Sequence, residues 1–92
     1  MEKKVCVILP CYRVKHKIYN VYTKLIKEKI DLIIFVDDFC PQKSVSYLKS
    51  KVKYKKKVQF IFLKKNFGVG GATIKGLQSA YNQGYDILIK FD

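Results

Sequence analysis

The chain has 92 residues, and its 19 Lys or Arg against 7 Asp or Glu give a formal net charge of +12 at pH 7. A hydrophobic content of 49% is globular rather than disordered, and no apolar run approaches the roughly 20 residues that cross a bilayer. The first apolar run, 5–9, is too short for a signal peptide and meets Pro10 instead of a cleavage site. We expect one small domain whose basic surface attracts an anionic partner.

The cysteines indicate a reducing compartment. There are three, an odd number without paired spacing, which argues against a disulfide scaffold. Cys6 lies in an apolar run and is expected in the core. Cys11 and Cys40 fall in expected loops, and neither has the C-x-x-C spacing of a metal or redox site. A catalytic cysteine is disfavoured, because the only histidine, His16, lies in a lysine-rich turn.

In chain order, the first expected strand is 5–9, and Pro10 closes it because proline cannot donate to a ladder. An amphipathic helix follows over about 16–28, where apolar residues recur at helical spacing between lysines. The next strand, 32–36, is a continuous apolar run that leads straight into Asp37-Asp38. Such a run is typical of a strand buried on both faces of a parallel sheet.

In the second half, Ser44 is the expected N-cap of a short helix that carries Val45, Leu48 and Val52. A strand at 58–63 leads into a glycine-rich loop at 64–71. A helix then begins at about Ala72, with Gly84 as its stop. One face of this helix is expected to carry Ile74, Leu77, Gln78 and Tyr81.

A last strand, 86–92, completes the order β-α-β-α-β-α-β. Alternating strands and helices predict a Rossmann-like α/β fold with a parallel sheet and right-handed crossovers. No linker or repeat divides the chain, so residues 1–92 are expected to form one unit. It stops on a strand with no covering helix, so we expect it to be truncated at the C-terminus.

Polar features converge at the carboxyl ends of the expected strands. They are the segment 10–13, Asp37-Asp38, the segment 66–71 and, after the last strand, Asp92. Open α/β sheets bind ligands at this edge, and two acids would be costly to bury without partners. The alternative is that the paired acids only end a strand and open a turn.

The glycine-rich loop points to a phosphate ligand. Gly68, Gly70 and Gly71 lead into a helix N-terminus, where backbone N–H groups and the helix dipole favour anions. The loop is not a dinucleotide fingerprint, because Thr73 takes the place of the third glycine, and no G-K-[ST] marks a P-loop. The alternative is that these glycines only allow a tight turn and close helix packing.

Four segments, in this order, resemble those of family 2 glycosyltransferases of the GT-A fold. They are 7–12, 36–38, 66–72 with Gly76 and Ala80, and 86–92. The chain looks closest to the polyprenyl-phosphate mannosyl- and glucosyltransferase-like branch. The resemblance implies the N-terminal, donor-binding half of an inverting, metal-dependent enzyme of cell-surface glycan synthesis. The donor would be a UDP- or GDP-sugar, and the acceptor a lipid-linked phosphate or a polysaccharide.

The resemblance also implies a role for each matched residue. Pro10 and Tyr12 flank the nucleobase, and Asp38 hydrogen-bonds it with Asp37 as its supporting neighbour. Asp92 matches the first acid of a D-x-D motif, which holds Mg²⁺ or Mn²⁺ against the diphosphate. The residues that match the segment beside the ribose and phosphates are Asn66, Gly68, Gly70 and Gly71. No catalytic residue falls within the chain, which is therefore expected to be inactive alone.

Two departures from the family pattern leave the donor sugar open. Arg13-Val14 stands where the family usually has Asn-Glu, and Phe39-Cys40 stands where it usually has Gly-Ser. The expected location is the cytoplasm, with peripheral contact between the basic surface and the anionic inner face of the membrane. The alternative is a non-catalytic basic α/β module that binds nucleotide or nucleic acid. Specific nucleic-acid binding is not expected, because the lysines lack the aromatic interleaving of a recognised RNA-binding type.

Overall fold

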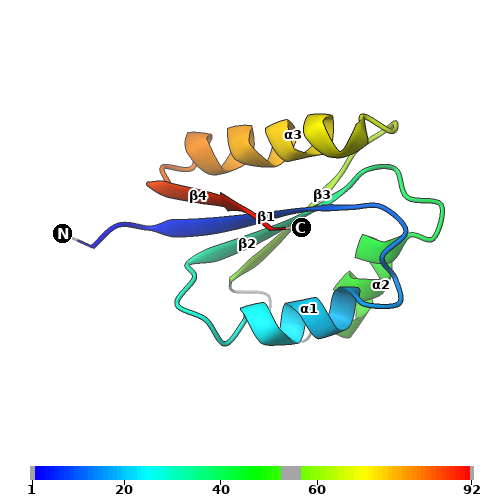
Figure 1. Ribbon diagram of the computed structural model, residues 1–92, viewed down its shortest axis with the longest axis horizontal. Helices are drawn as coiled ribbons and strands as arrows, with labels where there is room; N and C mark the ends of the chain where they lie inside the picture. Colours follow the sequence, from blue (N-terminus) through cyan, green and yellow to red (C-terminus); the bar gives the residue numbers. More distant parts are fainter. Residues whose placement is uncertain (1, 53–56, 92) are drawn as a thin grey trace.

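The computed structural model describes residues 2–52 and 57–91, which alternate strand and helix as predicted (Figure 1). The elements are β1 (Val5–Cys11), α1 (Ile18–Leu25), β2 (Leu32–Asp37), α2 (Ser44–Lys51), β3 (Val58–Phe62), α3 (Gly68–Asn82) and β4 (Ile87–Lys90). All strand pairs are parallel, and the sheet order is β3-β2-β1-β4. The Rossmann-like α/β fold class is therefore confirmed.

The helices cover both faces of the sheet, α1 and α2 on one face and α3 on the other (Figure 1). The chain runs from β1 outward to β3 and then crosses back through α3 to place β4 on the other side of β1. Neighbouring strands whose helices lie on opposite faces make a crevice outside their carboxyl ends. In this fold that crevice lies beyond β1, next to β4.

β2 is the centre of the core, and each of its residues is buried. Side chains alternate along a strand, so Ile33 and Phe35 pack with α1 and α2 while Ile34 and Val36 pack with α3. This burial on both faces confirms the prediction made from the continuous apolar run.

β1 continues through Pro10 and Cys11, so the prediction that Pro10 closes the strand is wrong. The Phe91 N–H donates to the Ile8 carbonyl over 2.9 Å, which shows that the polar groups of Ile8, and hence of Pro10, face β4. The β1–β4 pairing ends at Ile8 and Lys90, before Pro10 is reached. The missing N–H of proline therefore removes no bond from the described ladder.

α3 differs from its prediction in both its start and its buried face. It begins at Gly68 rather than near Ala72. Its buried residues are Ala72, Gly76 and Ala80, while Ile74 and Tyr81 are 55% and 74% exposed. A Cβ on Gly76 would lie 2.4 Å from Ile8 Cγ2 and 3.1 Å from Val36 Cγ2. Close approach to the sheet therefore selects the small residues, whereas the prediction followed the large apolar ones.

α1 is shorter than predicted, but it buries Ile18, Tyr22 and Leu25 as expected. α2 has Lys43, at a φ of 52°, in its N-cap position, so the assignment of Ser44 as N-cap is wrong. Ser44 is fully buried. Its hydroxyl contacts Val14 and Cys40, which precede α2, instead of capping its own helix. Within residues 2–52 and 57–91, no helix combines the length and the apolar character needed to span a bilayer.

Candidate functional site

The adjacent carboxylates at the end of β2 point to opposite faces of the sheet. Alternation along the strand sends Asp37 towards α2, where it lines a cavity with Cys40 and Lys43. It sends Asp38 towards α3, where Asp38 Oδ1 accepts the Phe67 N–H over 2.7 Å. The two acids therefore do not form a carboxylate pair for one ligand.

Asp38 organises the start of α3. Its carbonyl accepts Asn66 Nδ2 over 3.2 Å, and Asn66 Oδ1 accepts the Gly68 N–H over 3.1 Å. Three of the predicted site residues are thus joined in one network, in which Asn66 holds the loop in place. Asp38 is only 3% exposed, and its Oδ2 makes no hydrogen bond within the described part of the chain. That oxygen remains available as an acceptor.

A pocket beside Asp38 collects the predicted nucleobase residues. Its lining consists of Pro10, Cys11, Tyr12, Val14, Asp38 and Val69. It offers one carboxylate acceptor, apolar walls and the half-exposed Tyr12 ring. Ligand sites commonly combine mostly apolar walls with a few placed polar groups, so this pocket suits a planar ring that carries an N–H donor. Sequence reasoning missed Val69 and Val14, because an isolated valine in a loop or helix start carries no signal.

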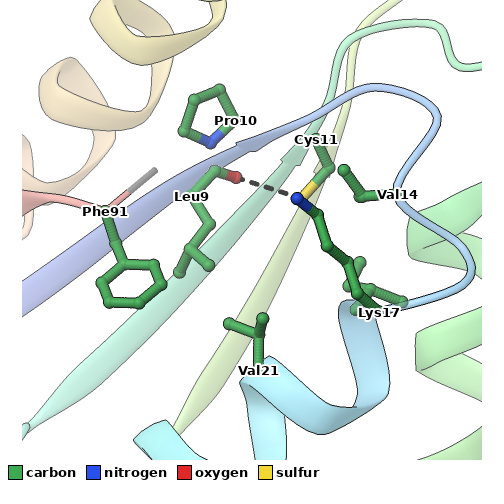
Figure 2. Close-up of a pocket in the computed structure, with 8 residues that line it drawn as sticks. Leu9, Pro10, Cys11, Val14, Lys17, Val21 and Phe91 are labelled. Carbon is green, nitrogen blue, oxygen red and sulfur yellow. Dashed lines mark hydrogen bonds between the residues drawn. The ribbon is translucent and has the colours of Figure 1, made fainter.

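A second cavity lies on the α1 side of the end of β1 (Figure 2). Leu9, Val21 and Phe91 supply its apolar wall, and Lys17 is the one charged side chain that the described part of the chain contributes to its lining. The Cys11 thiol donates to the Leu9 carbonyl over 3.3 Å, as the dashed line in Figure 2 shows. Among the described residues no carboxylate lines this cavity, so they suit an N–H donor less well than those of the Asp38 pocket do.

The predicted glycine loop is the first turn of a helix. Gly68, at a φ of 82°, is the one of its three glycines that needs the left-handed region, and Gly70 and Gly71 are helical. Phe67, in the N-cap position of α3, makes no side-chain cap bond, and the first turn holds no acid, but the Asp38 and Asn66 side chains already accept the N–H groups of Phe67 and Gly68. The first N–H groups of a helix have no partner within it and favour an anion. The helical start therefore still offers N–H groups for a phosphate, but they are those of the residues after Gly68.

The two departures from the family pattern touch one another. Cys40 Sγ accepts the Arg13 N–H over 3.0 Å and lies 3.1 Å from Ser44 Oγ. Ser44 Oγ in turn accepts the Val14 N–H over 3.1 Å. These bonds tie the loop after β1, in which Arg13 has a φ of 57°, to the start of α2. The loop that lines the Asp38 pocket is thus held from behind by a thiol and a hydroxyl.

Burial and hydrogen bonds shift the pKa values of two side chains in this region, Cys40 and Asp37. Burial raises the pKa of the Cys40 thiol, but the hydrogen bonds from Ser44, Arg13 and Gln42 outweigh it, and the pKa falls below its usual value. Burial raises the pKa of Asp37, the Cys40 N–H opposes this rise, and the neighbouring Asp38 charge adds to it. Asp37 is 8% exposed, and its Oδ1 has no hydrogen-bond partner among the described residues.

The predicted metal ligand, Asp92, lies outside the described residues. Among those that the structure does describe, no three His, Cys, Asp or Glu side chains gather closely enough to hold a metal ion. The divergence of Asp37 and Asp38 explains why the acids at the rim do not form such a group. Mg²⁺ and Mn²⁺ sites usually combine carboxylates with substrate phosphates, so the described residues do not fit such an ion by themselves.

Comparison with known proteins identifies the family. The model of glycosyl transferase family 2 matches residues 6–92. The chain is 35% identical, over 103 aligned positions, to the UDP-N-acetylglucosamine–dolichyl-phosphate N-acetylglucosaminyltransferase of Methanococcus voltae. The alignment covers 99% of this chain and 41% of that relative. No solved structure is significantly similar. Together with a sheet and helix order consistent with the N-terminal half of a GT-A fold, these matches show that the chain belongs to glycosyl transferase family 2.

Proposed function

We propose that the chain binds the nucleotide-sugar donor of an inverting, metal-dependent glycosyltransferase of cell-surface glycan synthesis. The donor is a UDP- or GDP-sugar, and the acceptor is a lipid-linked phosphate or a growing polysaccharide at the inner face of the cell membrane. One observation carries the proposal: Pro10, Tyr12 and Asp38 line a single pocket beside the start of α3. The relative from Methanococcus voltae, whose name gives a UDP-sugar donor and a dolichyl-phosphate acceptor, supports the same classes of substrate.

In this proposal Asp38 recognises the base. The Phe67 N–H fixes Oδ1 and so sets the orientation of the carboxylate, which leaves Oδ2 to accept an N–H of uracil or guanine. A hydrogen bond to a charged group contributes about 1.5–3 kcal/mol. The Tyr12 ring supplies an aromatic surface for the base, and the guanidinium of Arg13 lies 5.4 Å from the centre of that ring.

The diphosphate is placed at the start of α3. The N–H groups that follow Gly68 in the first turn of α3 lie at this edge of the sheet, and the exposed Lys64 and Lys65 precede the helix. Backbone N–H groups and the positive end of the helix dipole stabilise a phosphate at such a position. The exposed lysines add electrostatic attraction for the incoming donor.

A divalent metal completes the proposed donor site, with Asp92 and the donor phosphates as its ligands. When bound, Mg²⁺ or Mn²⁺ would neutralise charge on the diphosphate leaving group. The residues of this chain bind and orient the donor, but we expect those at 2–52 and 57–91 to supply no base for the acceptor. Glu2 and Glu28 precede β1 and β2 and so lie at the opposite edge of the sheet. Inverting transfer needs a base within hydrogen-bond reach of the acceptor hydroxyl, so the chain alone is expected to transfer no sugar.

A thermal-shift screen tests the proposal. A ligand that binds only the folded chain raises its melting temperature, so UDP or GDP should do so, and more strongly with Mn²⁺. No shift with any nucleoside diphosphate, with or without Mn²⁺, would contradict the proposal. The alternative of a basic nucleic-acid-binding module predicts a strongly salt-dependent affinity for DNA or RNA instead.

A further inference from the structure

The exposed acids of the described residues gather at one edge of the sheet, where lysines such as Lys27 and Lys29 also lie. The exposed acids Glu2, Glu28, Asp31 and Asp86 all precede strands. Two of them bond the starts of strands: Asp31 Oδ2 accepts the Val5 N–H over 2.6 Å, and Asp86 Oδ2 accepts the Lys4 N–H over 2.8 Å. At the carboxyl edge, within residues 2–52 and 57–91, the acids are Asp37 and Asp38, and both are buried. That edge therefore exposes no described carboxylate.

Basic residues occupy the loops of the carboxyl edge. Each loop that follows β1, β2 or β3 exposes at least one of them, and those used here are Arg13, Lys15, Lys43, Lys64 and Lys65. In a parallel sheet these loops all lie at one edge. The carboxyl edge therefore exposes basic residues that no exposed described carboxylate offsets, in a chain whose net charge is +12.

The same edge exposes three phenylalanines near the outer strand β3, which we call the aromatic corner. Phe39, Phe62 and Phe67 are 59%, 43% and 40% exposed. Phe39 has a φ of 57°, which is unusual for a bulky residue. The corner lies on the β3 side of the edge, whereas the Asp38 pocket opens beside β1.

Hydrogen bonds hold the loops of the aromatic corner together. The Leu63 N–H donates to the Asp37 carbonyl over 2.9 Å, and the Phe67 N–H donates to Asp38 Oδ1 over 2.7 Å. The loop after β3 is therefore fastened to the end of β2. Exposed aromatic rings on fastened loops are available to a partner at little cost in ordering.

Lysine ammonium groups already lie over two of these rings. Lys49 Nζ is 5.7 Å from the centre of the Phe62 ring, and Lys65 Nζ and Lys75 Nζ are 5.1 Å and 5.3 Å from that of Phe67. Nucleic-acid bases bind aromatic residues by stacking on the ring face, and a lysine already competes for such a face on Phe62 and on Phe67. An edge that mixes apolar rings with lysines is typical of surfaces that lie at an anionic lipid interface.

We propose that the aromatic corner and its surrounding lysines dock on the anionic headgroups of a lipid bilayer. The choice of a bilayer rests on the proposed function in one respect, since a lipid-linked acceptor lies in a membrane. The phenylalanines enter the headgroup region, and the lysines attract the anionic lipids. In this orientation the carboxyl edge, and with it the donor pocket, faces the membrane that holds the acceptor.

Sedimentation with vesicles tests the proposal. Vesicles of phosphatidylcholine with phosphatidylglycerol are compared with vesicles of phosphatidylcholine alone, both free of any acceptor lipid. We expect binding to the anionic vesicles, reduced at least about tenfold in a Lys64→Glu/Lys65→Glu variant, because each basic residue near the surface contributes to attraction. The matched control is Lys27→Glu/Lys29→Glu, which changes net charge equally at the opposite edge and should bind almost as the wild type does.

A second pair of variants tests the rings. Phe39→Asn removes an exposed ring with a residue that tolerates a positive φ, and Tyr81→Asn removes an exposed ring at the far end of α3. Phe39→Asn should weaken vesicle binding, and Tyr81→Asn should not. Absence of binding to anionic vesicles, or equal losses within either matched pair, would overturn the proposal. So would tighter binding of single-stranded RNA than of vesicles, lost in Phe39→Asn.

The test separates this proposal from the proposed function. Binding of UDP or GDP to the same variants is measured without vesicles, and Phe39→Asn should leave it unchanged. Vesicle binding that persists when no nucleoside diphosphate binds would contradict the donor site alone. Nucleotide binding that persists when no vesicle binds would contradict the lipid surface alone.

Discussion

Gly76 lies where α3 comes closest to the sheet, so Gly76→Ala tests the packing of the fold. The added Cβ would lie 2.4 Å from Ile8 Cγ2 and 3.1 Å from Val36 Cγ2, and both neighbours are fully buried in the centre of the sheet. Overpacking of this kind costs about 1–3 kcal/mol. Alanine is better than glycine in a helix by about 1 kcal/mol, which offsets part of the cost. The net expectation is a loss of up to about 2 kcal/mol.

Gly70→Ala is the matched control. Gly70 is also helical, but a Cβ there meets no atom within 4 Å. The gain in helix propensity is common to both variants, so the difference in unfolding free energy between them isolates the clash, at about 1–3 kcal/mol. For a chain of this size that corresponds to at least about 4 °C in melting temperature. Urea denaturation followed by circular dichroism measures it, and equal stabilities of the two variants would refute the packing argument.

Three further outcomes are expected. Burial raises the pKa of Asp37 above its usual value of 3.8, so the folded chain loses stability as the pH rises above that value and the carboxyl group ionises. Asp37→Asn, which cannot ionise, should therefore stabilise the chain at neutral pH. The gain, followed by urea denaturation, should vanish in acid, and a gain that grew in acid would contradict this assignment. Limited alkylation with peptide mapping should modify Cys40 first, since its pKa is lowered whereas burial raises the pKa of Cys6 to about 11 and of Cys11 to about 12; modification of another thiol first would count against the thiol cluster. Calorimetric titration should show Mn²⁺ binding in the presence of UDP or GDP, which Asp92→Ala removes, and identical curves would leave Asp92 without a role as a ligand.

The sheet could be predicted because its strands are unambiguous in the sequence. The continuous apolar run that ends in Asp37-Asp38 can be buried only between two layers, and parallel strands follow from the alternation with helices. Pro10 was misjudged because its effect depends on which neighbouring strand its nitrogen faces. That direction is set by the β1–β4 register, which no local pattern reveals.

The candidate site could be located at its edge of the sheet but not resolved in detail. Adjacent acids look like one pair in a sequence, although alternation along β2 sends Asp37 and Asp38 to opposite faces. The glycines that looked like a loop form the start of α3, because glycine adopts helical dihedral angles as well as those of turns. Of the three, only Gly68 takes a positive φ, and Gly70 and Gly71 are helical. The hydrogen bonds between Arg13, Cys40 and Ser44 join segments distant in sequence and were invisible to local reasoning.

Calorimetric titration of UDP and GDP into wild type, Asp38→Asn and Asp37→Asn tests most directly the claim that the Asp38 pocket binds the donor nucleotide. Asparagine at position 38 can still accept the Phe67 N–H through its oxygen, but it presents an amide donor where Oδ2 accepted. Loss of a charged hydrogen bond worth about 1.5–3 kcal/mol predicts an affinity at least about tenfold weaker, with an unchanged circular dichroism spectrum. Asp37→Asn, on the opposite face, should bind as the wild type does. Equal affinities of wild type and Asp38→Asn for whichever nucleotide binds would contradict the account.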